Sequence, residues 1–112
     1  MLLVELDVFS GRPNPRWELD EPSAKVLRQL LRRLPITADS PPEPAGLGYR
    51  GFVFTDDSGP SRAYKGYVIR TDVVLADPSL TVERFLLDRL PTEFQELGRR
   101  VALELERVGP GA

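Results

Sequence analysis

Hydrophobic and polar positions alternate along the first nine residues of the chain. The even positions from 2 to 8 are all leucine or valine, while the odd positions include Glu5 and Asp7. A period of two is typical of a strand that buries one face. Trp17 and Leu19 alternate with Arg16 and Glu18 in the same way. We therefore expect a second short strand that pairs with the first as a hairpin.

Spacings of three and four residues between apolar positions predict three helical segments. The first begins at Asp20, whose side chain can cap a helix, with Pro22 in the first turn, and it ends before Pro35. Thr81 is the expected cap of the second, and Pro91 the expected start of the third. The apolar positions are Leu27, Leu30, Leu31 and Leu34 in the first segment, Val82, Phe85, Leu86 and Leu90 in the second, and Phe94, Leu97, Val101, Leu105 and Val108 in the third.

Between the first two helices, prolines and glycines mark residues 36–48 as a loop. Residues 51–55 and 63–69 have strand composition and are joined by a turn at 56–61. Gly66 indicates a bulge or a close backbone approach, and a further short strand is expected within 72–76. The order of elements predicts an α+β, two-layer domain, in which a mainly antiparallel sheet of about five short strands is covered by two to three helices. Residues 1–108 form this single domain, and residues 109–112 are expected to be a flexible tail.

Composition limits the possible partners. With 17 acidic and 15 basic residues among 112, the formal net charge is −2, so no overall field favours nucleic acid or a membrane surface. The N-terminus carries acidic residues and lacks the basic leader of a signal peptide, and no apolar run approaches the length that spans a bilayer. We therefore expect a soluble, cytoplasmic protein that binds neither nucleic acid nor membrane.

Cysteine and histidine are both absent from the sequence. Their absence excludes disulfides, the usual zinc ligand sets, catalytic triads with histidine, and cysteine nucleophiles. Asp56 and Asp57 are a weak candidate for a calcium or magnesium site, because the ligand spacing of a calcium loop is missing and aspartate is common in turns. The sequence therefore predicts no metal, no cofactor and no catalytic residue.

The loop from Phe9 to Trp17 is the most distinctive stretch of the chain. Pro13 and Pro15 stiffen it, and Gly11 allows a sharp turn before them. A stiff loop loses little entropy on binding, and it presents an arginine fork and an amide. The alternative is that these side chains bond within the loop itself. The candidate binding residues are Ser10, Arg12, Asn14, Trp17 and Tyr49.

The residues of this loop, together with a second motif downstream, resemble those of a known protein family. The motif from Phe9 to Trp17, followed by Leu-Gly-Tyr-x-Gly-Phe at residues 47–52, resembles a family of small, largely uncharacterised bacterial proteins. The resemblance implies a shared fold, and it carries no activity, ligand or catalytic residue.

Three functions remain open on the sequence alone. The leading hypothesis is a non-catalytic binding or accessory module that recognises a peptide, a protein or a small anionic ligand at the loop from Ser10 to Trp17. The second is an enzyme that combines a carboxylate such as Asp7 with Arg12, aided by Lys65 or a tyrosine, in an acid/base reaction. The third is a structural homodimer subunit, since the apolar stripe of the last helix could form a dimer seam.

Overall fold

The fold is seen in a computed structural model that describes residues 1–9, 11–44 and 48–108. Ser10 of the candidate binding set, Leu47 of the second motif and the expected tail at 109–112 lie outside the described residues.

Six strands form one sheet in the order β2-β1-β3-β4-β5-β6, and every neighbouring pair is antiparallel. The bounds are β1 Leu3–Leu6, β2 Arg16–Glu18, β3 Phe52–Asp56, β4 Gly59–Tyr64, β5 Tyr67–Ile69 and β6 Val74–Ala76. The expected hairpin of the first two strands is confirmed, because Val4 pairs with Trp17. β1 also pairs with β3, which places the N-terminal strand inside the sheet rather than at its edge.

The sixth strand comes from a turn that the sequence analysis treated as a bulge. Residues 63–69 are two strands rather than one, and Tyr64 pairs directly with Tyr67 across Lys65 and Gly66. Both turn residues have positive φ, 48° for Lys65 and 87° for Gly66. Positive φ at both central positions is the conformation that a two-residue hairpin turn requires. Glycine at the second of these positions therefore reverses the chain.

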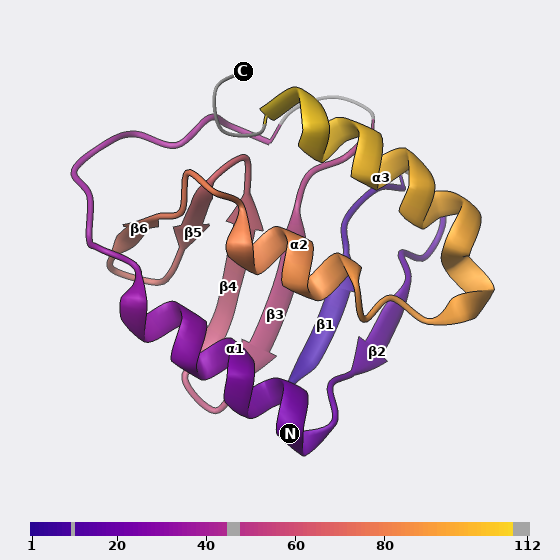
Figure 1. The fold of residues 1–112 in the computed structure, drawn as a ribbon, viewed down its shortest axis with the longest axis horizontal. Coiled ribbons are helices and arrows are strands. Elements are labelled where there is room, and N and C mark those ends of the chain that lie inside the picture. The colour runs from indigo at the N-terminus through magenta and orange to yellow at the C-terminus, as the bar shows by residue number, and fades with distance from the viewer. Residues whose placement is uncertain (10, 45–47, 109–112) are drawn as a thin grey trace.

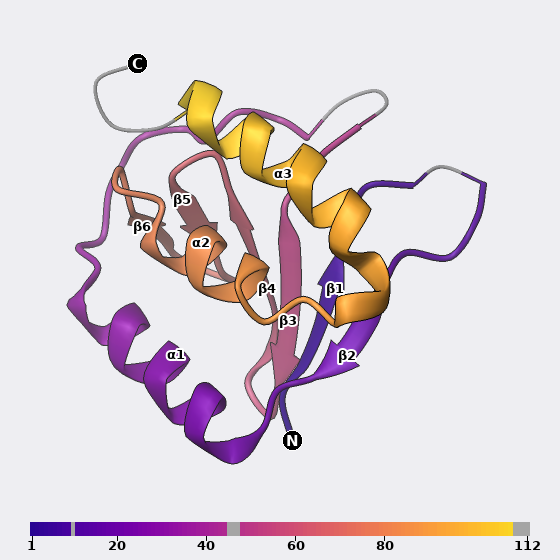
Figure 2. The ribbon, with the colours of Figure 1, turned by 45° about the vertical axis from the view of Figure 1, so that its right-hand side comes forward.

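Three α-helices cover one face of the sheet, as Figures 1 and 2 show from two directions. They are α1 Glu21–Arg33, α2 Thr81–Leu87 and α3 Gln95–Val108, with a short 3-10 turn, η1 Thr92–Phe94, before α3. This is the expected α+β arrangement of a sheet with helices on one side. None of the described helices combines the length and the apolar character needed to cross a membrane.

One predicted helix cap is confirmed and another is wrong. Asp20 caps α1, since its carboxylate accepts a hydrogen bond from the Ser23 amide at 2.8 Å. Thr81, in contrast, is the first residue of α2 and not its cap. The buried Asp77 accepts bonds from the backbone amides of Thr81 and Val82, and from the Thr81 hydroxyl. Asp77, upstream of the helix, supplies the hydrogen-bond acceptor because Leu80 at the cap position has left-handed backbone geometry and no polar side chain.

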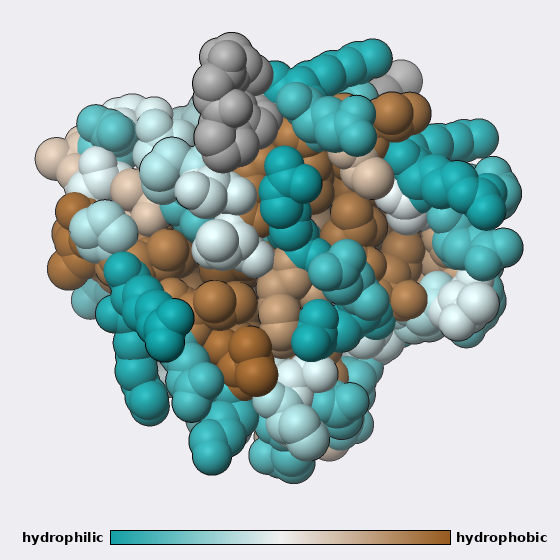
Figure 3. All heavy atoms as spheres, viewed as in Figure 1, coloured by the Kyte–Doolittle hydropathy of each residue, from teal (hydrophilic) through white to brown (hydrophobic). Residues whose placement is uncertain are grey.

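The core lies between the sheet and the helices. Its buried members include Val4 and Leu6 of β1, Phe52 and Phe54 of β3, and Leu27 of α1. In Figure 3, hydrophilic residues follow the outer sides of the helices, and hydrophobic residues gather in the seams between them. The stripe of α3 is part of this core, since Val101 and Leu105 are buried within the chain. These two positions of the stripe are therefore used for packing within the chain.

Candidate functional site

The side chain of Asn14 holds the loop between β1 and β2. Its carbonyl oxygen accepts hydrogen bonds from the backbone amides of Val8, at 3.0 Å, and Phe9, at 2.7 Å. Its amide nitrogen donates to the carboxylates of Glu5, at 2.8 Å, and Asp7, at 3.3 Å. An asparagine amide has two donors and two acceptor sites, so Asn14 is fully engaged inside the protein.

Asp7, just after β1, lies between two arginines. Its carboxylate accepts hydrogen bonds at 2.8 Å from Arg50, which precedes β3, and from Arg62 in β4. Arg50 also donates to the Phe9 carbonyl at 2.9 Å, which connects the same group to the loop. Burial disfavours the charged carboxylate, but the hydrogen bonds and positive charges of Arg62 and Arg50 outweigh it and lower the pKa of Asp7. Asp7 therefore keeps its negative charge to a lower pH than an ordinary aspartate, and its bonds fix the base of the loop.

The two glycines of the second motif adopt backbone conformations that favour glycine. Gly48 and Gly51 both have positive φ, at 95° and 97°. A Cβ at Gly51 would lie 2.5 Å from the backbone oxygen of Ala63, a distance that no side chain tolerates. The two residues before Gly51 have different partners, since Arg50 bonds to Asp7 and Tyr49 bonds to Glu83 of α2.

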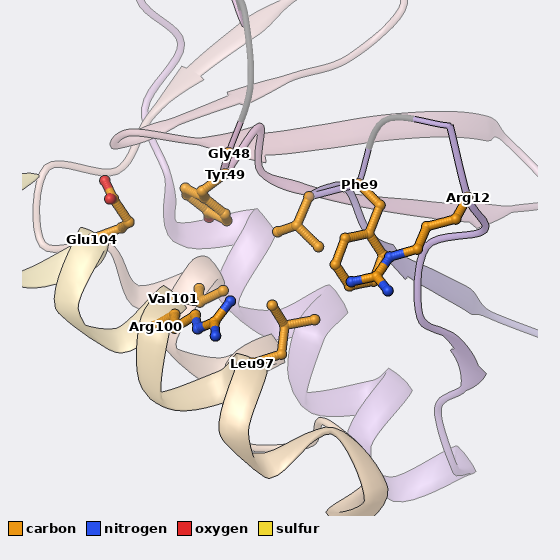
Figure 4. Close-up of a pocket in the computed structure, with 9 residues that line it drawn as sticks. Phe9, Arg12, Gly48, Tyr49, Leu97, Arg100, Val101 and Glu104 are labelled. Carbon is orange, nitrogen blue, oxygen red and sulfur yellow. The ribbon is translucent and has the colours of Figure 1, made fainter.

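A pocket of about 400 Å³ opens between this region and α3. Its lining consists of Val8, Phe9, Arg12, Gly48, Tyr49, Leu97, Arg100, Val101 and Glu104. Figure 4 shows Phe9 and Arg12 at one end and Tyr49 with Glu104 at the other, while the residues of α3 form one side. The guanidinium of Arg12 lies over the Phe9 ring, 3.9 Å from its centroid, which is a cation–π arrangement.

Tyr49 connects the pocket to a buried carboxylate. Its hydroxyl donates to Glu83 of α2 at 2.9 Å, and the other carboxylate oxygen accepts from the backbone amide of Gly66 at 3.1 Å. Glu83 is 1% exposed. Burial raises the pKa of Glu83 to about 7, assisted by the charge of Asp77, although the bonds from Gly66 and Tyr49 and the charge of Arg84 act in the opposite direction. Burial and Glu83 also raise the pKa of Tyr49, so its hydroxyl stays protonated.

The structure separates the candidate binding residues into two groups. Arg12 and Tyr49 line the pocket. Asn14 does not line it, and its hydrogen bonds serve the loop. Trp17 lies in β2, where its ring packs edge-on against Phe52 with centroids 6.4 Å apart. Ser10 is outside the described residues.

Sequence reasoning missed the contribution of α3 to the pocket. Leu97 was assigned only to the core stripe, and Arg100 and Glu104 were not singled out. Their spacing carried a usable signal, because residues three and four apart share a face of a helix and place 97, 100, 101 and 104 together. The burial of Glu83 could have been predicted in a similar way, because Glu83 lies three residues before Leu86, which is buried, and shares its helix face.

Two shielded carboxylates with a shifted pKa, Asp7 and Glu83, lie outside the pocket lining. Asp7 bonds to Arg50, Arg62 and Asn14, and no bond from Arg12 to Asp7 exists within the described part of the chain. The pocket lining presents apolar side chains, the guanidinium groups of Arg12 and Arg100, and the carboxylate of Glu104.

Comparison with known proteins adds no relative. No protein-family model, no curated protein and no solved structure matches this chain.

Proposed function

We propose that this protein is a non-catalytic binding module that recognises a small anionic ligand in the pocket between the β1–β2 loop and α3. The observation that carries the proposal is the convergence of Phe9 and Arg12 from the first motif, Tyr49 from the second, and Arg100 from α3 around one cavity of about 400 Å³. Pockets that hold small ligands have volumes of roughly 300–1,000 Å³ and combine apolar walls with a few polar groups.

Two further observations support binding by a preformed site. The loop is held at its base by Asn14 and by the pairing of Asp7 with Arg50, so little ordering is needed when a ligand arrives. Among the described residues, neither Arg12 nor Arg100 forms an ion pair within the chain. Their charges therefore remain available to an anion.

The test is a titration of isotopically labelled protein with a library of small acidic molecules, followed by amide NMR. We expect shifts at Phe9, Arg12, Tyr49 and Leu97. The matched variants are Leu97→Glu, which places a negative charge in the pocket, and Leu103→Glu, at an exposed position of the same helix. Leu97→Glu should abolish the shifts and Leu103→Glu should keep them. Shifts confined to other surfaces of the parent protein would show the proposed site to be wrong.

A further inference from the structure

The charges around the pocket indicate what kind of anion it holds. Its lining contains two arginines, Arg12 and Arg100, and a single carboxylate, Glu104. The lining thus carries one net positive charge. A ligand with one negative charge neutralises it, whereas a dianion leaves an excess negative charge beside Glu104. Like charges in a pocket of this size repel each other.

The other residues of the lining indicate the chemical character of the rest of the ligand. Val8, Phe9, Tyr49, Leu97 and Val101 supply side chains of apolar or aromatic character. The hydroxyl of Tyr49 is bonded to Glu83 in the interior, so the ring rather than the hydroxyl is presented to the pocket. Burying apolar ligand surface against such walls contributes roughly 25 cal/mol for each Å² removed from water.

We propose that the pocket takes an organic monocarboxylate with a flat, apolar body, whose carboxylate is recognised by the arginines and whose body packs between the Phe9 and Tyr49 ends. This inference rests on the proposed function and narrows it to one class of ligand. The guanidinium fork suits a carboxylate, because two parallel hydrogen bonds form between the planar groups.

Three small probes with the same ring separate this class from others. Phenylacetate carries one negative charge, phenylacetamide is neutral, and phenyl phosphate is mostly a dianion above a pH of about 6. We expect phenylacetate to bind roughly tenfold more tightly than phenylacetamide, as one charge-assisted hydrogen-bonded pair provides. It should also bind more tightly than phenyl phosphate. Acetate, which lacks the apolar body, should bind more weakly than phenylacetate.

Neighbouring arginines on α3 provide a matched control. Arg100 lines the pocket, whereas Arg99 does not and is paired with Glu96. Arg100→Ala should weaken phenylacetate binding by roughly fivefold to tenfold, and Arg99→Ala should leave it unchanged. Both positions are exposed, so both variants should fold.

The outcomes distinguish this inference from the proposed function. If phenyl phosphate shifts the pocket amides at lower concentration than phenylacetate, the ligand class is wrong while the proposed function stands. If the neutral phenylacetamide does so, the recognition of an anion fails as well, and only the position of the site stands. Equal losses in the Arg99 and Arg100 variants would also overturn the ligand class. If none of the probes perturbs Phe9, Arg12, Tyr49 or Leu97, the inference and the proposed site both fail.

Discussion

Asp7 and Glu83 are two shielded carboxylates that support residues of the pocket lining, and their environments shift their pKa values in opposite directions. Asp7 meets the guanidinium groups of Arg50 and Arg62, and its pKa falls below the ordinary value. Glu83 meets a hydroxyl and a backbone amide, and burial raises its pKa to about 7. Both side chains fix a pocket wall, since Asp7 holds the base of the loop and Glu83 holds Tyr49.

Two differences account for the opposite signs. Glu83 is fully buried, and its bonds from neutral groups and the charge of Arg84 do not offset its desolvation, whereas Asp7 is half-buried and hydrogen bonds from charged arginines more than offset its desolvation. Asp7 therefore stabilises the fold above the pKa it has when unfolded, and this contribution is lost as the pH falls through its lower folded pKa. For Glu83 the dependence is reversed, because its folded pKa is raised.

The largest expected effect comes from Asp7→Ala. The change leaves Arg50 and Arg62 without their shared carboxylate in a half-buried position. Removing one partner of a shielded ion pair costs about 3 kcal/mol, which lowers the melting temperature by roughly 10 °C. Thermal unfolding measures this loss of stability. Glu96→Ala is the control, because Glu96 pairs with Arg99 at an exposed site and the loss of that pair should cost under about 1 kcal/mol. Equal losses in the two variants would contradict the importance of the Asp7 group.

A smaller effect, visible as a pH dependence, is expected from Glu83→Gln. The folded protein holds a proton on Glu83 up to a pH of about 7, whereas the unfolded chain releases it near the ordinary value of 4.5. The folded state therefore binds more protons between these values, and this group makes stability fall as the pH rises from about 4.5 to about 7.

Glutamine does not titrate, so the variant should lose that slope and exceed the parent by roughly 1–3 kcal/mol at pH 8. Urea unfolding between pH 5 and pH 8 measures the difference. The exposed Glu93→Gln serves as the control and should follow the parent. A parent and a Glu83 variant with parallel pH profiles would show that Glu83 is ionised throughout this range.

The smallest effect on stability is expected from Arg12→Ala. Arg12 is exposed, and its guanidinium stacks on the Phe9 ring. An exposed cation–π contact contributes about 0.5–1 kcal/mol, so the melting temperature should change by only a few degrees. Arg50→Ala is the informative comparison, because Arg50 bonds both Asp7 and the Phe9 carbonyl. If the Arg12 variant lost as much stability as the Arg50 variant, Arg12 would belong to the framework of the loop rather than to a binding surface.

Much of the local structure follows from the sequence alone. Alternation in residues 2–8 set β1 and its buried side, and Asp20 with Pro22 set the start of α1. These features depend on neighbouring residues, whose spacing matches the period of a strand or a helix. The expected left-handed turn at Gly11, with φ of 81°, belongs to the same class. The division of residues 63–69 into β4 and β5 was missed, although Lys65 and Gly66 hold a local turn signal.

The site depended on tertiary structure. Asp7 is 43 residues from Arg50 and 55 from Arg62, and they meet because β1 pairs with β3 and β3 with β4. No local period encodes that strand order. The pocket likewise joins Arg12 to Arg100 only because α3 packs across the end of the sheet that carries the loop. The sequence identified Arg12 and Tyr49 as candidates, while the fold assigned Asn14 to the support of the loop and brought Arg100 and Glu104 to the pocket.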